Sequence, residues 1–398
     1  MLIAALAWRD LIRDRFFLLC NAAVMVGILV PLLVLFGVKN GVYAALIGQM
    51  LADPANLQID TAGNATLTEA EIAPLRTWPE IAFVTPKVRT QFDYMNIRAK
   101  DGRRMRPALV IPTGAGDPTL PPGTTLEVGE VAVSAQLAQQ LDLKPGTELQ
   151  MISQAEDRPK QLVLPATVAL VLPETATSGA AVLAPFATLD LIEAFYDSYS
   201  LPEYGIEGRK PLSERIPAYS GLRVYARSLE GLASLQSRIE AQLGIGTTAN
   251  TRAVESLLGL GRKLNLALAG TAVLAAIGLG AALVLGFWSE VARKRSILAT
   301  IALLGVPGRN LALFPVVQAL ITAALGLVLS FALYALAARG AAELFGEGMP
   351  GEAPLAVITP QQGALISLAV LILVAVAAAA AAWSAQRLDP ASVLREAA

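Results

Sequence analysis

Charged side chains are absent from four long, largely apolar runs of the 398-residue chain. A helix needs about 20 predominantly apolar residues to cross the hydrocarbon core of a bilayer, and each run exceeds that length. The last run, 353–386, is most apolar from residue 363 onward. The pattern therefore predicts four membrane-spanning helices, at 16–38, 264–289, 310–338 and 363–386.

Residues 39–263 have a different pattern, with charges throughout and shorter apolar segments. Asp101-Gly102 between two polar-apolar segments predicts a hairpin with a type I′ turn. Ser134 is a suitable N-cap for a helix. We expect strands at 130–133, 148–152 and 162–172, and helices at 135–141, 187–196 and 229–243. The fold class is thus an α-helical four-span membrane bundle with an α+β extracytoplasmic domain inserted between spans 1 and 2.

Lysine and arginine near short loops predict the orientation of the spans, because such residues accumulate on the cytoplasmic side. They gather before the first run, between the second and third, and after the fourth. Loop 339–362 instead carries one arginine and three glutamates. We therefore expect both termini (1–15 and 387–398) and loop 290–309 in the cytoplasm, and 39–263 and 339–362 outside. Run 16–38 is longer than the core of a signal peptide, so we expect it to remain as an anchor.

The first fifteen residues predict an amphipathic helix at the membrane surface. Trp8, Leu11, Ile12 and Phe16 share one helical face, while the neighbouring charged residues fall elsewhere.

Composition excludes several kinds of chemistry. The chain has no histidine and a single cysteine, Cys20, so His-dependent catalysis, His-ligated metal sites and an intramolecular disulfide are excluded. The net charge of −1 argues against a nucleic-acid binder. The sequence contains no GxxxxGK[ST] motif, so it holds no P-loop for ATP. We expect no enzyme activity, cofactor or metal on this chain.

Small residues recur at four-residue spacing within the second run, at Gly278, Ala282 and Gly286. This spacing favours close helix packing, either within the bundle or at a seam between two copies. The four runs contain no Asp, Glu, Lys, Arg or His, which argues against an ion-coupled carrier.

Four segments carry a resemblance to a known family. They are the N-terminal helix at 6–15, the stretch 129–146 with Glu130-Val131-Ala132-Val133-Ser134, the basic loop 293–305, and the tail 389–395. In this order and topology the chain resembles the FtsX-like permeases of the MacB and LolC/LolE type, which are membrane subunits of ABC transporters. The stretch 129–146 is similar to the periplasmic core domain of that family.

The resemblance implies a permease driven by a separate cytosolic ATPase, which would bind the ATP and Mg²⁺. It identifies loop 290–309 as the coupling segment. The candidate coupling residues are Arg293, Lys294, Arg295, Leu298, Leu304 and Gly305. The loop departs from the family pattern at Ile297, where an acidic residue is usual, and at Ala302, where an arginine is usual. The same basic residues also suit contact with anionic lipid.

The family resemblance further implies a bacterial inner-membrane protein that works as a homodimer or heterodimer and exports or extracts a hydrophobic or lipidated substrate. A periplasmic adaptor is a further candidate partner. Two alternatives stay open: an FtsX-like regulator of a cell-wall hydrolase, and a membrane sensor without an ATPase. The size of the inserted domain favours export.

Overall fold

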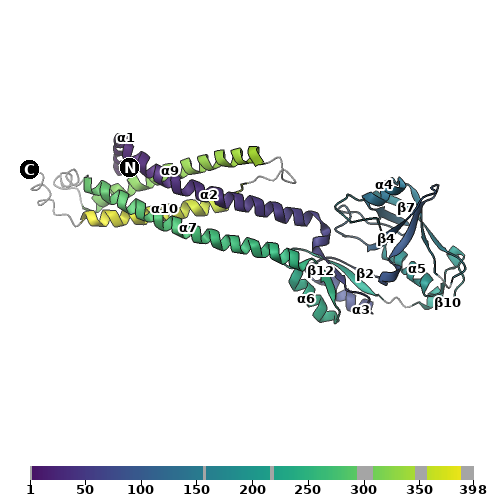
Figure 1. The fold of residues 1–398 in the computed structure, drawn as a ribbon. Coiled ribbons are helices and arrows are strands. Elements are labelled where there is room, and N and C mark those ends of the chain that lie inside the picture. The colour runs from purple at the N-terminus through teal and green to yellow at the C-terminus, as the bar shows by residue number, and fades with distance from the viewer. Residues whose placement is uncertain (1, 156–157, 216–218, 294–307, 346–355, 387–398) are drawn as a thin grey trace, which may run out of the picture. The chain divides into compact units, whose positions relative to one another are not determined.

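The computed structural model describes residues 2–155, 158–215, 219–293, 308–345 and 356–386. The chain forms two compact units (Figure 1). The helical unit comprises Met1–Ile47 and Leu260–Ala398, and the β-rich unit comprises Gly48–Gly259. The β-rich unit is therefore an insertion in the chain of the helical unit, as the charge pattern predicts.

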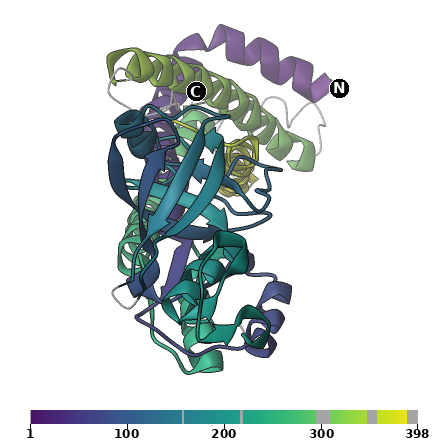
Figure 2. The same cartoon turned by 90° about the vertical axis from the view of Figure 1, so that its right-hand side faces the viewer.

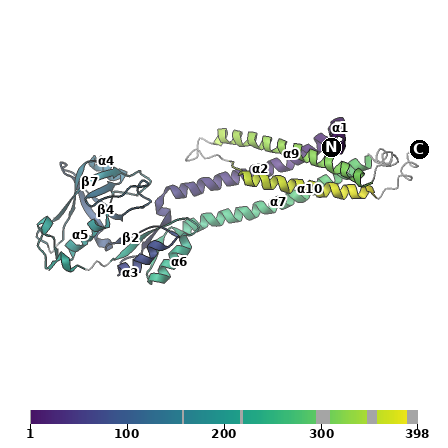
Figure 3. The same ribbon diagram turned by 180° about the vertical axis from the view of Figure 1, so that it is seen from behind.

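Long helices build the described part of the helical unit. They are α1 (Leu2–Arg13), α2 (Arg15–Ala52), α7 (Thr251–Arg293), α9 (Gly308–Phe345) and α10 (Pro360–Gln386). All except α1 are long and apolar enough to cross a membrane. α9 packs along both α10 and α1, which Figure 3 shows from behind. The prediction of four long apolar helices, with a β-rich region between the first and second, is confirmed.

Two of these helices extend well beyond the apolar runs that predict them. α2 continues past residue 38 to Ala52, and α7 begins at Thr251, before residue 264. The added turns contain charged and amide side chains such as Asn40 and Arg262. The length of a charge-free run indicates how many residues can lie in the hydrocarbon core of a membrane. It does not mark the ends of the helix, because the backbone hydrogen bonds continue through polar residues as well. The β-rich unit consequently begins and ends inside these two helices.

Small side chains fill the centre of the helical unit. Ala319 and Ala323 of α9 face Ala377, Ala378 and Ala381 of α10 in one buried cluster. Larger residues complete the cluster from α2 and α7: Met25, Leu29, Leu279, Leu283 and Phe287. Small residues permit close helix approach, which drives helix association in a bilayer, where burial from water contributes little.

A four-stranded antiparallel sheet forms one part of the β-rich unit. Its order is β12 (Thr247–Ala249), β1 (Gln58–Thr61), β11 (Gly221–Ala226), β2 (Ile81–Lys87). β11 is buried along its whole length because it is a central strand. The helices α3 (Glu69–Ile72) and α6 (Leu232–Leu243) accompany this sheet, and α6 packs on β12.

A closed six-stranded barrel forms the other part (Figure 2). Around the barrel the strands are β3 (Tyr94–Ala99), β4 (Met105–Thr113), β8 (Ala181–Pro185), β5 (Glu130–Val133), β7 (Leu162–Val171) and β6 (Glu148–Ser153). The pairs β4–β8 and β5–β7 are parallel and the others are antiparallel. The helices α4 (Ala135–Leu141) and α5 (Phe186–Tyr196) belong to this part, followed by the short pair β9 (Tyr199–Ser200) and β10 (Lys210–Pro211).

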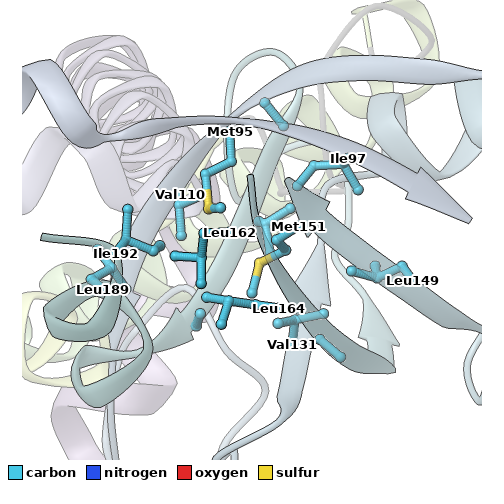
Figure 4. Close-up of a cluster of buried hydrophobic side chains, with 14 of the residues drawn as sticks. Met95, Ile97, Val110, Val131, Leu149, Met151, Leu162, Leu164, Leu189 and Ile192 are labelled. Carbon is cyan, nitrogen blue, oxygen red and sulfur yellow. The ribbon is translucent and has the colours of Figure 1, made fainter. Parts of the chain in front are cut away.

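Alternating apolar residues of the barrel strands build its core. Figure 4 shows Met95 and Ile97 of β3 with Met151 of β6 and Leu162 and Leu164 of β7. Leu189 and Ile192 of α5 join the same cluster. Strand alternation thus decides which residues turn inward.

The strands and helices predicted for this unit are confirmed, although α6 begins at Leu232 instead of residue 229. Ser134 caps α4 as predicted, since its side chain accepts a hydrogen bond from the Leu137 backbone N–H at 3.3 Å. The same Oγ accepts from the Ala181 backbone N–H at 3.0 Å and so links α4 to β8.

The predicted turn type of the β3–β4 hairpin is wrong, although the hairpin itself is present. A type I′ turn needs positive φ at both central residues, and neither Asp101 nor Gly102 has one. Instead the Gly102 backbone N–H donates to the Ala99 carbonyl at 2.9 Å, so Lys100 and Asp101 are the central residues of the turn. The longer connection, from residue 100 to 104, removes the need for the mirror-image turn.

Candidate functional site

The first candidate site is a set of polar contacts where α7 ends beside the junction of α1 and α2. The Arg293 guanidinium forms an ion pair with Asp14 at 3.1 Å. The Arg293 Cζ also lies 5.7 Å from the centre of the Phe17 ring. We call Asp14, Phe17 and Arg293 the basal clasp. It joins the last residue of α7 to the residue that precedes α2.

α1 is attached to α9 in the same region. The Gln318 amide donates a hydrogen bond to Asp10 at 2.7 Å, and Leu11 is buried. Trp8 and Ile12 are exposed. A helix is present in the predicted segment, but α1 ends at Arg13 and Phe16 belongs to α2. The predicted apolar face is divided, because Leu11 is buried whereas Trp8 and Ile12 are exposed.

Buried polar side chains continue from this end into the helical unit. Asn21 of α2 donates from Nδ2 to the Phe17 carbonyl at 3.2 Å. The Thr322 hydroxyl of α9 donates a hydrogen bond to the Gln318 carbonyl at 3.0 Å. Glu290 of α7 is 4% exposed and follows directly after the charge-free run. Buried polar groups are thus concentrated near the basal clasp.

The predicted coupling residues fall mostly outside the described residues. Arg293 is the last residue of α7 and belongs to the basal clasp. Lys294, Arg295, Leu298, Leu304 and Gly305 lie in 294–307, which the structure does not describe. Through Arg293 the basal clasp includes one residue of the predicted coupling segment 290–309.

The three small residues predicted to pack on one face of α7 differ in how closely they approach other helices. A Cβ at Gly286 would lie 3.0 Å from the Asn21 Oδ1, so this glycine permits a close contact. Ala282 is half-buried, and Gly278 is exposed with open space where its Cβ would be. Within this chain only the Gly286 end of the stripe packs closely. Sequence reasoning missed Gly326, whose Cβ would lie 2.9 Å from the Met25 sulfur.

The second candidate site is an apolar groove of about 700 Å³ between α2, α7 and α10. Leu32 and Phe36 line it from α2, Ala275 from α7, and Leu365 and Ile372 from α10. Gln362 is the one amide among its lining residues. The volume lies within the range of small-molecule and cofactor pockets, and the lining suits a hydrocarbon chain.

Hydrogen bonds hold the segment before α10 against α2 beside this groove. The Val357 backbone N–H donates to the Gly37 carbonyl at 2.9 Å. Asn40 donates to the Val357 carbonyl at 3.2 Å and to the Gln362 side chain at 2.9 Å. Asn40 was not singled out by sequence reasoning, although an amide two residues after a 23-residue apolar run is a recognisable signal.

Comparison of the chain with protein-family models and with curated proteins gives no match.

Proposed function

We propose that this chain is the permease subunit of an ABC transporter that transmits the motion of a separate cytosolic ATPase to the β-rich unit. The cargo is a hydrophobic or lipidated molecule taken from the outer side of the membrane. The proposal rests on the sequence resemblance to FtsX-like permeases, and the architecture supports it.

The observation that carries the proposal is the continuity of α2 and α7. Their 38 and 43 residues correspond to about 57 Å and about 64 Å of helix at 1.5 Å per residue. A hydrocarbon core needs only about 30 Å. Each helix therefore has enough length to cross a membrane and still enter the β-rich unit without a break. A continuous helix transmits axial displacement or tilt better than a chain interrupted by a loop.

The basal clasp supplies the other end of this arrangement. A force applied to the coupling segment 290–309 would reach α7 through Arg293, which forms an ion pair with Asp14. Because Asp14 directly precedes α2, both helices that flank the β-rich unit respond together. The lysines and arginines at this end favour the cytoplasmic side, where the ATPase is located.

The apolar groove supports the nature of the cargo. It is bounded by α2 and α7, the same two helices that would move, and by α10. A groove of this lining accepts an acyl chain, and a change in the α2–α7 separation would alter its width. A second permease chain, identical or related, would complete the assembly.

The test is affinity capture of the tagged full-length chain from its native membrane in mild detergent. We expect a P-loop ATPase of the cytosol to co-purify in near-stoichiometric amount, as identified by mass spectrometry. A Lys294→Glu/Arg295→Glu variant should lose most of the captured ATPase, because reversed charge in a docking surface opposes association.

The matched control is Arg103→Glu/Arg104→Glu, which reverses two exposed charges in the β3–β4 loop. This control should capture as much ATPase as the wild type. Capture of a cell-wall hydrolase together with the ATPase, and of no lipidated cargo, would favour the regulator instead. Capture without any ATPase would exclude the transporter and favour a sensor.

A further inference from the structure

The β-rich unit contains a polar pocket that the proposed transport function does not use. It has a volume of about 410 Å³ and lies where the four-stranded sheet faces the barrel. Asp60 and Lys87 line it from the sheet, and Asp93 lines it at the start of β3. Thr177 of the β7–β8 connection and Arg223 of β11 are among its other polar lining residues. The volume is far larger than one water molecule occupies and falls within the range of ligand pockets.

A hydrogen-bonded network fixes one wall of the pocket. Arg223 forms a fully buried ion pair with Asp117 at 2.6 Å and donates to the Tyr225 hydroxyl at 2.7 Å. The Tyr225 hydroxyl donates to Gln58 at 2.6 Å, and Gln58 donates to Asp60 at 2.5 Å. This network orders the wall before any ligand arrives, which lowers the entropic cost of binding.

Three buried polar atoms at the pocket have no hydrogen-bond partner: the Asp93 Oδ1, the Thr177 Oγ1 and the Arg223 Nε. Asp93 is 8% exposed and Arg223 is 2% exposed. A buried polar atom without a partner is unfavourable because its desolvation is not compensated, so native structures rarely retain one. The three residues also line the same pocket, so these atoms are the groups to which a ligand bound there would have to be complementary.

The charges around the pocket define that molecule. Asp117 balances Arg223 at 2.6 Å, and Asp60 balances Lys87 at 3.4 Å. Lys87 is close enough to lower the pKa of the Asp93 carboxyl, but in the described part of the chain no ion pair joins Asp93 to a lysine or arginine. The Arg223 Nε–H is a donor and requires an acceptor, and the Thr177 hydroxyl can serve either role.

We propose that this pocket binds a small molecule that carries a primary ammonium group and, a few bonds away, an acceptor oxygen. The ammonium group donates to Asp93, and the oxygen accepts from the Arg223 Nε–H with support from Thr177. Amino alcohols and α-amino acids have this arrangement. A metal ion suits the pocket less well, because the described residues contain no group of three or more His, Cys, Asp or Glu side chains placed to hold one.

The test uses the full-length chain in lipid nanodiscs and three probes: ethanolamine, L-alanine and propionate. Ligand-observed NMR and calorimetry would measure binding. We expect ethanolamine or L-alanine to bind and propionate, which has no ammonium group, to bind at least about tenfold more weakly. The pKa of the Asp93 carboxyl is raised to about 7, so binding is measured at about pH 8, where the carboxyl is ionised. There the Asp93→Asn variant should weaken binding of the ammonium probe about tenfold or more, since a charged hydrogen bond is lost.

Two further variants separate a ligand site from a water-filled cavity. Thr177→Val should weaken binding severalfold while the thermal melting curve stays that of the wild type. Asp101→Asn, which neutralises an exposed carboxylate outside the pocket, should leave binding unchanged. Absence of binding of both ammonium probes at about 10 mM, or equal binding to the wild type and Asp93→Asn, would overturn the proposal. These results do not depend on whether an ATPase is captured, so the two proposals can fail separately.

Discussion

At the residue scale, Asp93 shows how strongly the fold changes the chemistry of one side chain. Burial raises the pKa of its carboxyl from 3.8 to about 7, and the negative charges of Asp60 and Glu193 add to this rise. Lys87 lowers the pKa but does not offset the burial. The carboxyl of Asp93 therefore titrates near neutral pH.

This shift predicts that Asp93 makes stability depend on pH. Its folded-state pKa is raised, so its contribution is fully present below about pH 4 and is lost as the pH rises through about 7. A shift from 3.8 to about 7 corresponds to at most about 4 kcal/mol. The melting temperature of the wild type should fall between about pH 5 and about pH 8. The melting temperature of Asp93→Asn should fall less over the same interval, because the titrating carboxyl is absent.

The control for this measurement is Asp101→Asn, whose carboxylate is exposed. It should keep the wild-type difference in melting temperature between the two pH values. An Asp93→Asn variant with the same pH dependence as the wild type would show that the carboxyl is not held in this environment.

Glycine packing gives a second prediction at this scale. Gly326→Leu should lower the melting temperature, because its Cβ alone would already lie 2.9 Å from the Met25 sulfur and overpacking costs about 1 to 3 kcal/mol. Gly278→Leu should leave the melting temperature unchanged, since that position faces open space. If Gly278→Leu instead destabilises as much as Gly326→Leu, the described packing of α7 is wrong. Loss of a dimer at unchanged melting temperature would place Gly278 at a seam between copies.

Some residues could be identified from sequence and others could not. Ser134 is predictable because a cap acts on its own helix, within three residues. Arg223 and Asp117 are more than 100 residues apart, and their pairing arises only when the sheet meets the barrel. The available signal was an arginine inside the apolar strand Gly-Leu-Arg-Val-Tyr-Ala, which predicts a buried partner but does not say which one.

At the element scale, the basal clasp assigns Arg293 a role inside the chain. Asp14→Arg and Arg293→Asp should each lower the rate of ATP hydrolysis by the captured complex, because each places like charges together at the clasp. The charge-swapped double variant Asp14→Arg/Arg293→Asp should restore most of it. The measurement is the rate of ATP hydrolysis by the captured complex for the four variants, read as a double-mutant cycle.

If Arg293 instead contacts the ATPase, the swapped variant stays as impaired as Arg293→Asp alone. The ion pair is partly exposed and contributes about 1 kcal/mol or less to stability, so protein yield should vary little across the cycle.

Sequence predicted the long helices better than it predicted their ends. Each charge-free run became one helix, since lipid-length apolar segments have few alternatives. The ends of α2 and α7 differ because polar helix follows apolar helix without a break. The closed barrel was not predicted, because its closure pairs β3 with β6 across about 50 residues and no local pattern specifies that register.

At the scale of the whole molecule, the β-rich unit is an insertion whose two ends lie in α2 and α7. The two flanking helices share one clasp at one end and each continues into the β-rich unit at the other. An ATPase acting on the adjoining segment would therefore change the β-rich unit through helices alone. The polar pocket would add sensitivity to a small ligand to the same unit.

The central claim, that ATP-driven motion reaches the β-rich unit, can be measured with two spin labels on the captured complex. Cys20 is the single cysteine and is exposed on α2, and Asp101→Cys adds an exposed site on the β-rich unit. We predict that the distribution of distances between the labels shifts between the nucleotide-free complex and the complex trapped with ATP. An unchanged distribution in a complex that hydrolyses ATP would contradict the account.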